Sequence, residues 1–298
     1  MEIEISRLFA DPTVTDVALN AFDRVSFKRE GLWLSGESPF GSETQFGDWL
    51  VDLVEAADGR LDFAHPAASV SVDGFRVHAL IGGQIAPNPS ATIRRLRMPT
   101  SGATFRDDSS LRRLEFLKSA VSARQNVLIA GAAGAGKTSL LRELLGSAGA
   151  ERIITIEDVA ELELDSSNVV RLVARESNVE GAGEIGLREL LVEALRMSPD
   201  RIIVGEIRGA ELLVILNALN TGHTGAGATI HANSLSSVVS RLEAIASMAG
   251  LEHGALARMV VDAFQLVAFV DAAGGHRITA IGRLVLSGQT LRVEEIHV

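Results

Sequence analysis

The stretch that decides the fold is "NVLIAGAAGAGKTSLLREL", residues 126–144, in which a glycine-rich turn separates an apolar run from an amphipathic one. Gly131, Gly136, Lys137 and Thr138 have the spacing of a Walker A P-loop, with a strand expected before the loop and a helix after it. Glycines let backbone N–H groups turn inward, and the helix N-terminus adds partial positive charge. We therefore predict a nucleotide-binding site here.

Each residue type in this loop has a chemical role. Lys137 can reach the β- and γ-phosphates of ATP, and the Thr138 hydroxyl can ligate Mg²⁺. Lysine occurs elsewhere only at Lys28 and Lys118, so a match by chance is rare. The residues expected to bind the nucleotide are Gly131, Ala133, Gly134, Ala135, Gly136, Lys137, Thr138 and Ser139.

The N-terminal part of the chain has the pattern of a small α+β domain. Asp73-Gly74 between alternating apolar arms is a strong hairpin signal. Helical apolar spacing begins at Phe46, and Gly59 is a plausible stop. The other segments that alternate like strands are residues 14–20, 24–30, 32–35 and 90–98. The polar, turn-rich stretch 99–110 then marks the domain boundary.

We accordingly place an α+β domain at residues 1–105 and an α/β domain at residues 106–298. The second domain alternates apolar strands with amphipathic helices, which is typical of a mainly parallel sheet. The expected strands are residues 126–131, 152–158, 169–174, 201–206 and 226–232. The expected helices are residues 138–147, 186–197, 210–220 and 234–250, the last capped by Asn233 or Ser234. Residues 264–298 have the pattern of three antiparallel strands.

One part of an ATP site is missing from "RIIVGEIRG", residues 201–209. A nucleotide-binding strand of this kind usually ends in an aspartate, but this one runs into Gly205 and Glu206. "RIITIED" supplies Glu157 and Asp158 at the carboxyl edge of the sheet, where open α/β folds bind ligands. Glu157 could orient the attacking water, and Glu206 could bind Mg²⁺ through water. The alternative for a lone carboxylate after a strand is a solvated loop charge.

Two histidines stand out in "NTGHTGAGATIHANS", residues 220–234. His223 is surrounded by glycines, and His231 ends a strand-like run from which it could sense the γ-phosphate. A histidine taken alone is more often a structural group. None of the histidines has a metal-ligand spacing such as HExxH. We therefore predict no protein-built metal site beyond the Mg²⁺ that accompanies the nucleotide.

Composition limits the class of protein. Of the 298 residues, 47% are hydrophobic, 22% are charged and none is cysteine, as in an ordinary globular protein without disulfides. The start, "MEIEISRLFADP", is acidic where a signal peptide would be basic, and no apolar run is long enough to span a bilayer. A net charge of −10 disfavours a phosphate-attracted nucleic-acid binder. These features predict a cytoplasmic protein.

The motifs together carry a family resemblance. The P-loop, "TIEDVAEL", "LRMSPDRIIVGEIRGAE" and "TGHTGAGATIHANS" occur in the order of the Walker A motif, Asp box, atypical Walker B motif and His box of the type II/type IV secretion ATPase superfamily. The likeness is strongest to the branch that assembles Tad (tight adherence, Flp) pili, and it covers nearly the whole chain. It implies a RecA-like P-loop ATPase domain preceded by a smaller N-terminal domain.

The resemblance also implies roles for the acids and histidines. Gly205 in place of aspartate is normal in this family. Glu157 would then be the catalytic carboxylate, and Glu206 would support Mg²⁺ or its water. His231, with His223, would form the His box.

Positive charge for the transition state is expected from arginines. "ATIRRLRMPT" concentrates Arg94, Arg95 and Arg97 just before the domain boundary. In the resembling family, arginines of this stretch reach the nucleotide, and Arg175 matches another recurrent arginine. Strand alternation separates Arg94 from Arg95 and Arg97 but does not tell which face meets ATP. The alternative is a solvated edge strand.

The resemblance implies a homohexameric ATPase that converts ATP and water to ADP and phosphate and does mechanical work through domain motions. Its expected partners are inner-membrane platform proteins of a pilus or secretion system, with no nucleic acid and no transmembrane segment. The expected location is peripheral, at the inner face of the cell membrane. Two alternatives stay open: a RecA-like nucleic-acid translocase, and a nucleotide-gated regulator that scarcely hydrolyses ATP.

Overall fold

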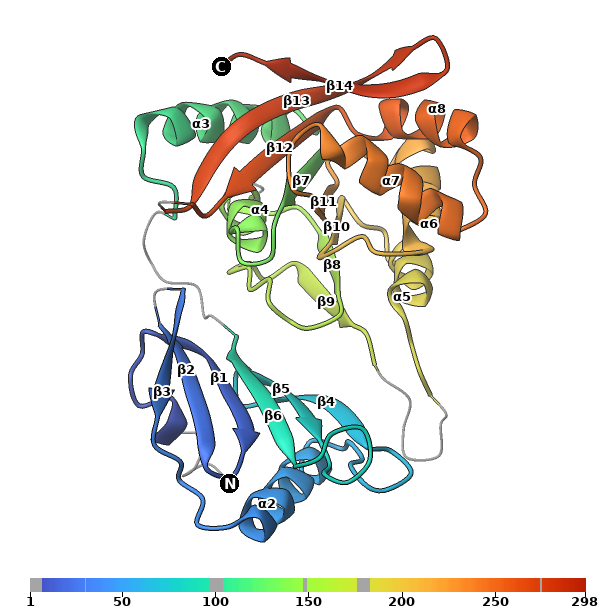
Figure 1. The fold of residues 1–298 in the computed structure, drawn as a ribbon. Coiled ribbons are helices and arrows are strands. Elements are labelled where there is room, and N and C mark those ends of the chain that lie inside the picture. The colour runs from blue at the N-terminus through green and yellow to red at the C-terminus, as the bar shows by residue number, and fades with distance from the viewer. Residues whose placement is uncertain (1–6, 30, 97–103, 147–148, 176–182, 274) are drawn as a thin grey trace. The chain divides into compact units, whose positions relative to one another are not determined.

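The computed structural model describes residues 7–29, 31–96, 104–146, 149–175, 183–273 and 275–298. The chain divides into two compact units, a smaller N-terminal one and a larger one that carries the P-loop (Figure 1). The predicted boundary at residues 105 and 106 lies beside residues outside the described ranges and stays a prediction. Phe105, however, is buried in the hydrophobic core of the larger unit, so this core starts before residue 106.

The smaller unit is a six-stranded antiparallel sheet with a helix against it, in the strand order β3-β2-β1-β6-β5-β4. The strands are β1 (Val14–Ala21), β2 (Arg24–Arg29), β3 (Leu32–Gly36), β4 (Ala67–Val72), β5 (Phe75–Leu80) and β6 (Ser90–Arg95). Helix α2 (Glu43–Glu55) begins after Ser42, whose hydroxyl accepts a hydrogen bond from the N–H of Gln45. It turns Phe46 and Leu50 into the core of this unit.

The hairpin predicted at Asp73-Gly74 is confirmed. Strands β4 and β5 pair up to Val72 and Phe75, which leaves only these two residues in the turn. Their φ angles are 47° and 80°, the left-handed backbone that a two-residue type I′ turn requires at both positions.

The larger unit is an eight-stranded sheet in the order β14-β13-β12-β7-β11-β10-β8-β9. All pairs from β12 to β9 are parallel, whereas β12, β13 and β14 are joined antiparallel. The strands are β7 (Val127–Gly131), β8 (Ile153–Glu157), β9 (Val169–Val173), β10 (Arg201–Val204), β11 (Gly227–His231), β12 (Leu266–Asp271), β13 (Arg277–Ser287) and β14 (Thr290–Ile296). The predicted α/β sheet and its antiparallel tail are confirmed.

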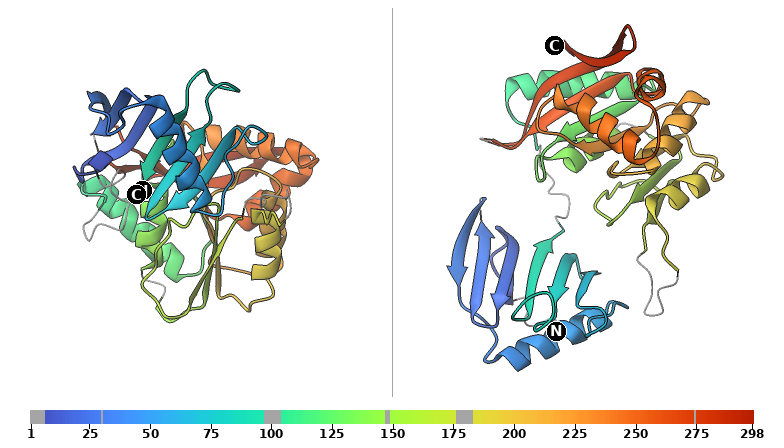
Figure 2. Two further views of the ribbon diagram at one scale, coloured as in Figure 1. Left: turned by 90° about the horizontal axis from the view of Figure 1, so that it is seen from below. Right: turned by 45° about the vertical axis from the view of Figure 1, so that its right-hand side comes forward.

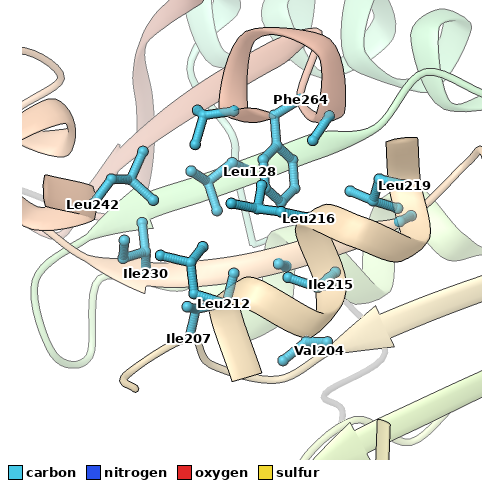
Figure 3. Packing of buried hydrophobic residues seen from close by; sticks show 14 of the residues in the cluster. Leu128, Val204, Ile207, Leu212, Ile215, Leu216, Leu219, Ile230, Leu242 and Phe264 are labelled. Atoms are coloured by element: carbon cyan, nitrogen blue, oxygen red, sulfur yellow. The ribbon is translucent and has the colours of Figure 1, made fainter. Parts of the chain in front are cut away.

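Helices cover both faces of this sheet because successive strand residues point to opposite sides. Leu128 and Ala130 of β7 pack with α5 (Leu187–Ala194), α6 (Glu211–Asn220), α7 (Ser237–Met248) and α8 (His253–Ala263). Val127 and Ile129 pack with α3 (Asp108–Ser122) and α4 (Lys137–Leu145) on the other face. Figure 2 shows the two helical layers, and Figure 3 shows the first cluster, in which Leu128, Leu216 and Phe264 meet.

Helices α3 and α8 were not among the predicted elements. Helix α3 begins inside the polar stretch 99–110, which predicts the domain boundary, because the Asp107 carboxylate accepts a hydrogen bond from the N–H of Ser110 and caps the helix. The last residues of this stretch, from Asp107 on, are therefore a helix start. At α7 the N-cap is Ser236, which makes no side-chain cap hydrogen bond. The Ser234 hydroxyl does accept a hydrogen bond from the N–H of Ser237, but the cap predicted at Asn233 or Ser234 lies ahead of the observed N-cap. No helix in the described part of the chain combines the length and the apolar character that a bilayer span requires.

Candidate nucleotide-binding site

The P-loop joins β7 to α4 at the carboxyl edge of the sheet, with Gly131 ending the strand and Lys137 beginning the helix. Gly134 and Gly136 have φ angles of 73° and 94°, which side chains rarely adopt. The loop can therefore turn its N–H groups inward, toward the space in front of the N-terminus of α4, where the helix adds partial positive charge. Of the other expected cradle residues, Ala133 is exposed, Ala135 is buried, and Thr138 and Ser139 are half-buried in the first turn of α4.

The Lys137 ammonium lies within this loop. Its Nζ donates to the carbonyl oxygens of Gly131 (3.0 Å) and Ala132 (2.9 Å), and it lies 3.2 Å from Nδ1 of His231. The residue is only 8% exposed. Burial lowers the pKa of Lys137, while neighbouring carboxylates oppose that shift. The positive charge of Lys137 is thus held beside the first residues of the P-loop.

His231 links this lysine to an acid. It ends β11, and its Nε2 lies 3.2 Å from the Glu206 carboxylate. Because the protonated lysine can only donate, Nδ1 accepts, and the proton of the neutral ring is on Nε2, which donates to Glu206. Burial and the charge of Lys137 both lower the pKa of His231, which favours this neutral form.

The acid continues into a charged network. Arg208 Nε lies 2.8 Å from Glu206, and its Nη1 lies 2.9 Å from Asp158. Burial alone would raise the pKa of Glu206, but the hydrogen bond and charge of Arg208 outweigh it, and the pKa is lowered. Glu206 is therefore ionised beside the P-loop and supplies the negative charge that the missing aspartate would otherwise give.

The structure also gives a reason for the missing aspartate. A Cβ at Gly205 would lie 3.1 Å from Glu157 Cγ and 3.4 Å from the carbonyl oxygen of Ile156. Strands β8 and β10 are neighbours here, and Gly205 donates its N–H to that same carbonyl. A side chain at residue 205 would push Glu157 out of place, so the acid follows one residue later.

Gly205→Ala should therefore lower the free energy of unfolding by about 1–3 kcal/mol, because the added methyl group overpacks a buried contact. Urea unfolding of the variant measures this loss. Gly254→Ala is the matched control: the nearest atom to its new methyl group is Arg258 Nη1 at 4.0 Å, and alanine favours the helix. Equal stability of the two variants would contradict the close approach at Gly205.

Glu157 lies at the site but points into the protein. It is 3% exposed, and its Oε1 accepts hydrogen bonds from the N–H groups of Glu161 (3.1 Å) and Leu162 (2.8 Å). Its Oε2 is buried and has no hydrogen-bond partner among the described residues. Burial raises the pKa of Glu157, although the two N–H groups oppose the shift. The carboxyl group thus shapes the loop that follows β8.

The raised pKa of Glu157 predicts how the free energy of unfolding changes with pH. Because the folded pKa of Glu157 lies above its ordinary value of 4.5, the folded protein keeps a proton that the unfolded chain loses. The resulting stabilisation is complete below pH 4.5 and is lost as the pH rises through the raised pKa. Glu157→Gln cannot ionise. The unfolding free energy of the wild type minus that of this variant should therefore fall from pH 4.5 to neutrality in parallel urea titrations; a constant or rising difference would contradict the shift.

Glu161 is a site residue that the sequence prediction missed. Its Oε2 lies 3.5 Å from the Thr138 hydroxyl, which donates toward it, and the side chain is exposed. Arg142 of α4 donates to its carbonyl oxygen at 2.6 Å. "TIEDVAEL" does contain this acid, but its position in the sequence does not tell that the chain turns back to α4 there.

His223 corrects a prediction, because the structure does not bring it to the P-loop of its own chain. Strand β11 runs from Gly227 to His231, so the loop before it lies at the amino edge of the sheet, opposite the P-loop. The N–H and the ring Nδ1 of His223 each lie 3.2 Å from the carbonyl oxygen of Ala218, at the end of α6. Its glycine neighbours serve this turn.

Arg94 and Arg95 have partners within the smaller unit. Arg94 Nε donates to Asp16 at 2.7 Å. Arg95 donates to the carbonyl oxygen of Phe9 at 2.7 Å, with its guanidinium 5.2 Å from the centre of that ring. Their expected contact with phosphate stays a prediction.

The other two arginines fall elsewhere. Arg97 lies outside the described residues. Arg175 follows β9, and its N–H donates to the carbonyl oxygen of Ile185 at 3.0 Å. The roles predicted for both stay predictions.

Comparison with known families decides the class of protein. The model of the family described as type II/IV secretion system protein matches residues 88–282. The chain belongs to this family. A protein of Mycobacterium tuberculosis named for conjugal transfer is 38% identical over 292 residues, which cover 93% of this chain and 82% of the relative. TrbB of Rhizobium radiobacter, also named for conjugal transfer, is 28% identical over 91% of this chain and 84% of the relative.

Solved structures of other proteins share the fold. The pilus retraction motor PilT with bound ADP matches with a TM-score of 0.63 and 20% identity, over 99% of this chain and 83% of PilT. The Legionella pneumophila ATPase DotB gives a TM-score of 0.61 and 19% identity, over 99% of this chain and 79% of DotB. The predicted fold class, a RecA-like P-loop ATPase domain with a smaller α+β domain before it, is confirmed.

Proposed function

We propose that this member of the type II/IV secretion family is an ATP-hydrolysing motor. The observation that carries the proposal is the convergence of Lys137, His231, Glu206 and Glu161 at one edge of the sheet, around a loop with P-loop geometry. Fixed charges around a phosphate-sized loop are what phosphoryl transfer needs, because its catalysis is mainly positioning and electrostatic stabilisation. The solved structures with this fold include two proteins named as ATPases and one named as a pilus retraction motor.

ATP with Mg²⁺ is the cofactor that these residues fit. Lys137 would bind the phosphates, and the N–H groups of the loop would surround them. Mg²⁺ prefers oxygen ligands and keeps several waters, which suits the Thr138 hydroxyl directly and Glu206 through water. When bound, the metal ion would neutralise charge on the phosphates. His231, already joined to Lys137 and Glu206, would sense the γ-phosphate by hydrogen bond.

The water-orienting carboxylate is the role for which sequence and geometry suggest different residues. The family resemblance favours Glu157, whereas the side-chain contacts favour Glu161. Glu161 is exposed and faces Thr138, while Glu157 is buried and accepts the N–H groups that start the Glu161 loop. We assign to Glu161 the role of orienting the attacking water, and to Glu157 the role of positioning Glu161. Glu161 would act on the reaction directly, and Glu157 would act only through Glu161.

Motor action would follow from ring assembly. We retain the proposals of a homohexamer and of transition-state charge supplied by Arg94, Arg95, Arg97 or Arg175, on the strength of the family resemblance alone. The ring would work at the inner face of the cell membrane with a platform protein. The motif likeness favours Tad pilus assembly, while the names of the relatives support conjugal transfer or type IV secretion as the wider class.

The test is the ATPase rate of the purified protein. Hydrolysis should require Mg²⁺ and should rise when platform protein and lipid are added, because a motor is coupled to its load. Single-stranded DNA should leave the rate unchanged. Stimulation by DNA would favour the nucleic-acid translocase instead, and binding of ATP with no turnover under any of these conditions would favour a nucleotide-gated regulator.

A further inference from the structure

A histidine from the far end of the chain lies on the P-loop. His276 Nε2 is 3.2 Å from the carbonyl oxygen of Gly134. Strand β12 runs parallel to β7 and ends at Asp271, and Arg277 pairs back with that residue in β13. Between them Gly275 has a φ of 109°. The hairpin therefore places His276 at the carboxyl edge of the sheet, where the P-loop begins.

The P-loop sequence leaves room for this ring. A Cβ at Gly136 would lie 2.8 Å from His276 Cδ2 and 3.5 Å from its Cγ, so the imidazole packs directly against the α-carbon of the glycine. Residue 136 thus has two reasons to be glycine: its φ of 94° and the position of His276. The contact joins residues far apart in sequence, and no local pattern predicts it.

The hydrogen bond fixes one peptide plane of the loop. A carbonyl oxygen only accepts, so Nε2 of His276 carries the proton and donates. In a trans peptide the C=O and the N–H point in opposite directions. Holding the Gly134 carbonyl toward His276 therefore directs the Ala135 N–H to the other side, where it lies 3.2 Å from the Ala132 carbonyl oxygen across the loop.

We propose that His276 is a positioning residue for the nucleotide, which orders the P-loop before the phosphates bind. The inference rests on the proposed function, because it matters only if the loop binds phosphates. A glycine-rich loop loses much conformational entropy when it is ordered, and a loop already ordered binds its ligand more tightly. The contact is made to the loop rather than to the reacting atoms. It therefore acts on nucleotide affinity and not on turnover.

Two substitutions distinguish the contribution of the ring from the contribution of its N–H donor. His276→Phe keeps a ring over Gly136 but has no donor, whereas His276→Gln keeps an N–H donor. The Phe variant should bind Mg-ATP and Mg-ADP about threefold to tenfold more weakly, as expected for one lost hydrogen bond, with kcat nearly unchanged. The Gln variant should recover most of the affinity. His276→Ala, which introduces no bulk, should match the Phe variant and replaces it if Phe does not fold.

Titration calorimetry measures the affinity of each variant for both nucleotides. Steady-state kinetics then measures kcat and KM. Wild-type affinity in the Phe and Ala variants would overturn the proposal. Equal losses in the Phe, Ala and Gln variants would also overturn it, because the effect would not follow the donor. If the wild type itself bound no Mg-ATP, the proposed function would fail, and that outcome is distinct from both.

Discussion

Lys137→Ala is expected to abolish ATP hydrolysis. The ammonium lies among the loop carbonyls of Gly131 and Ala132 and beside His231, with no other lysine in the chain beyond Lys28 and Lys118. Its loss removes the charge that would stabilise the β- and γ-phosphates. By analogy with the removal of one transition-state donor, kcat should fall at least ~100-fold. A coupled assay for released phosphate measures the change.

Lys118→Ala is the matched control for the loss of one lysine. Its Nζ lies 3.2 Å from Glu115 and 3.4 Å from Glu143 on the helices of the same unit, away from the loop. Such partly exposed ion pairs contribute little to stability, so this variant should hydrolyse ATP like the wild type. Hydrolysis that survives in Lys137→Ala and disappears in Lys118→Ala would remove the P-loop from the mechanism.

The second large effect is expected at Glu161. Glu161→Gln keeps the size of the side chain but cannot take a proton from water, so kcat should fall about 100- to 10,000-fold, the usual contribution of a general base. Its affinity for Mg-ATP should stay near that of the wild type, because the phosphates are held by the loop. Single-turnover kinetics together with a binding titration separate the two effects.

Glu157→Gln is the matched variant of the neighbouring acid. The glutamine oxygen can still accept the N–H groups of Glu161 and Leu162, so the loop keeps its anchor, and kcat should fall only about tenfold through misplacement. A large loss at Glu157 with a normal rate in Glu161→Gln would reverse the assignment and restore the role that the family resemblance gives to Glu157.

Local chemistry made much of the fold predictable from the sequence. The strand-loop-helix around Lys137 follows from apolar periodicity and glycine spacing, and the hairpin follows from Asp73-Gly74, which favours positive φ at both positions. Helix α3 was missed because its capping residue, Asp107, stands in a polar, turn-rich run of the kind that marks a domain boundary. In each case the outcome depended on residues close together in the chain.

The site was less predictable because its contacts depend on how the chain turns after each strand. Glu157 and Glu161 belong to the same motif, and only the folded loop distinguishes the buried acid from the exposed one. His223 precedes strand β11 and His231 ends it, which puts them at opposite edges of the sheet. The contact of His276 with Gly134 joins two segments that the sequence gives no reason to pair.

The central claim is that the loop around Lys137 binds a nucleoside triphosphate. Calorimetric titration of the purified wild type with Mg-ATP, with Lys137→Ala measured in parallel, tests it most directly. The account predicts saturable binding with one nucleotide per chain in the wild type and a loss of most of that affinity in the variant. Absence of binding to the folded wild type at every magnesium concentration, or undiminished binding to Lys137→Ala, would contradict it.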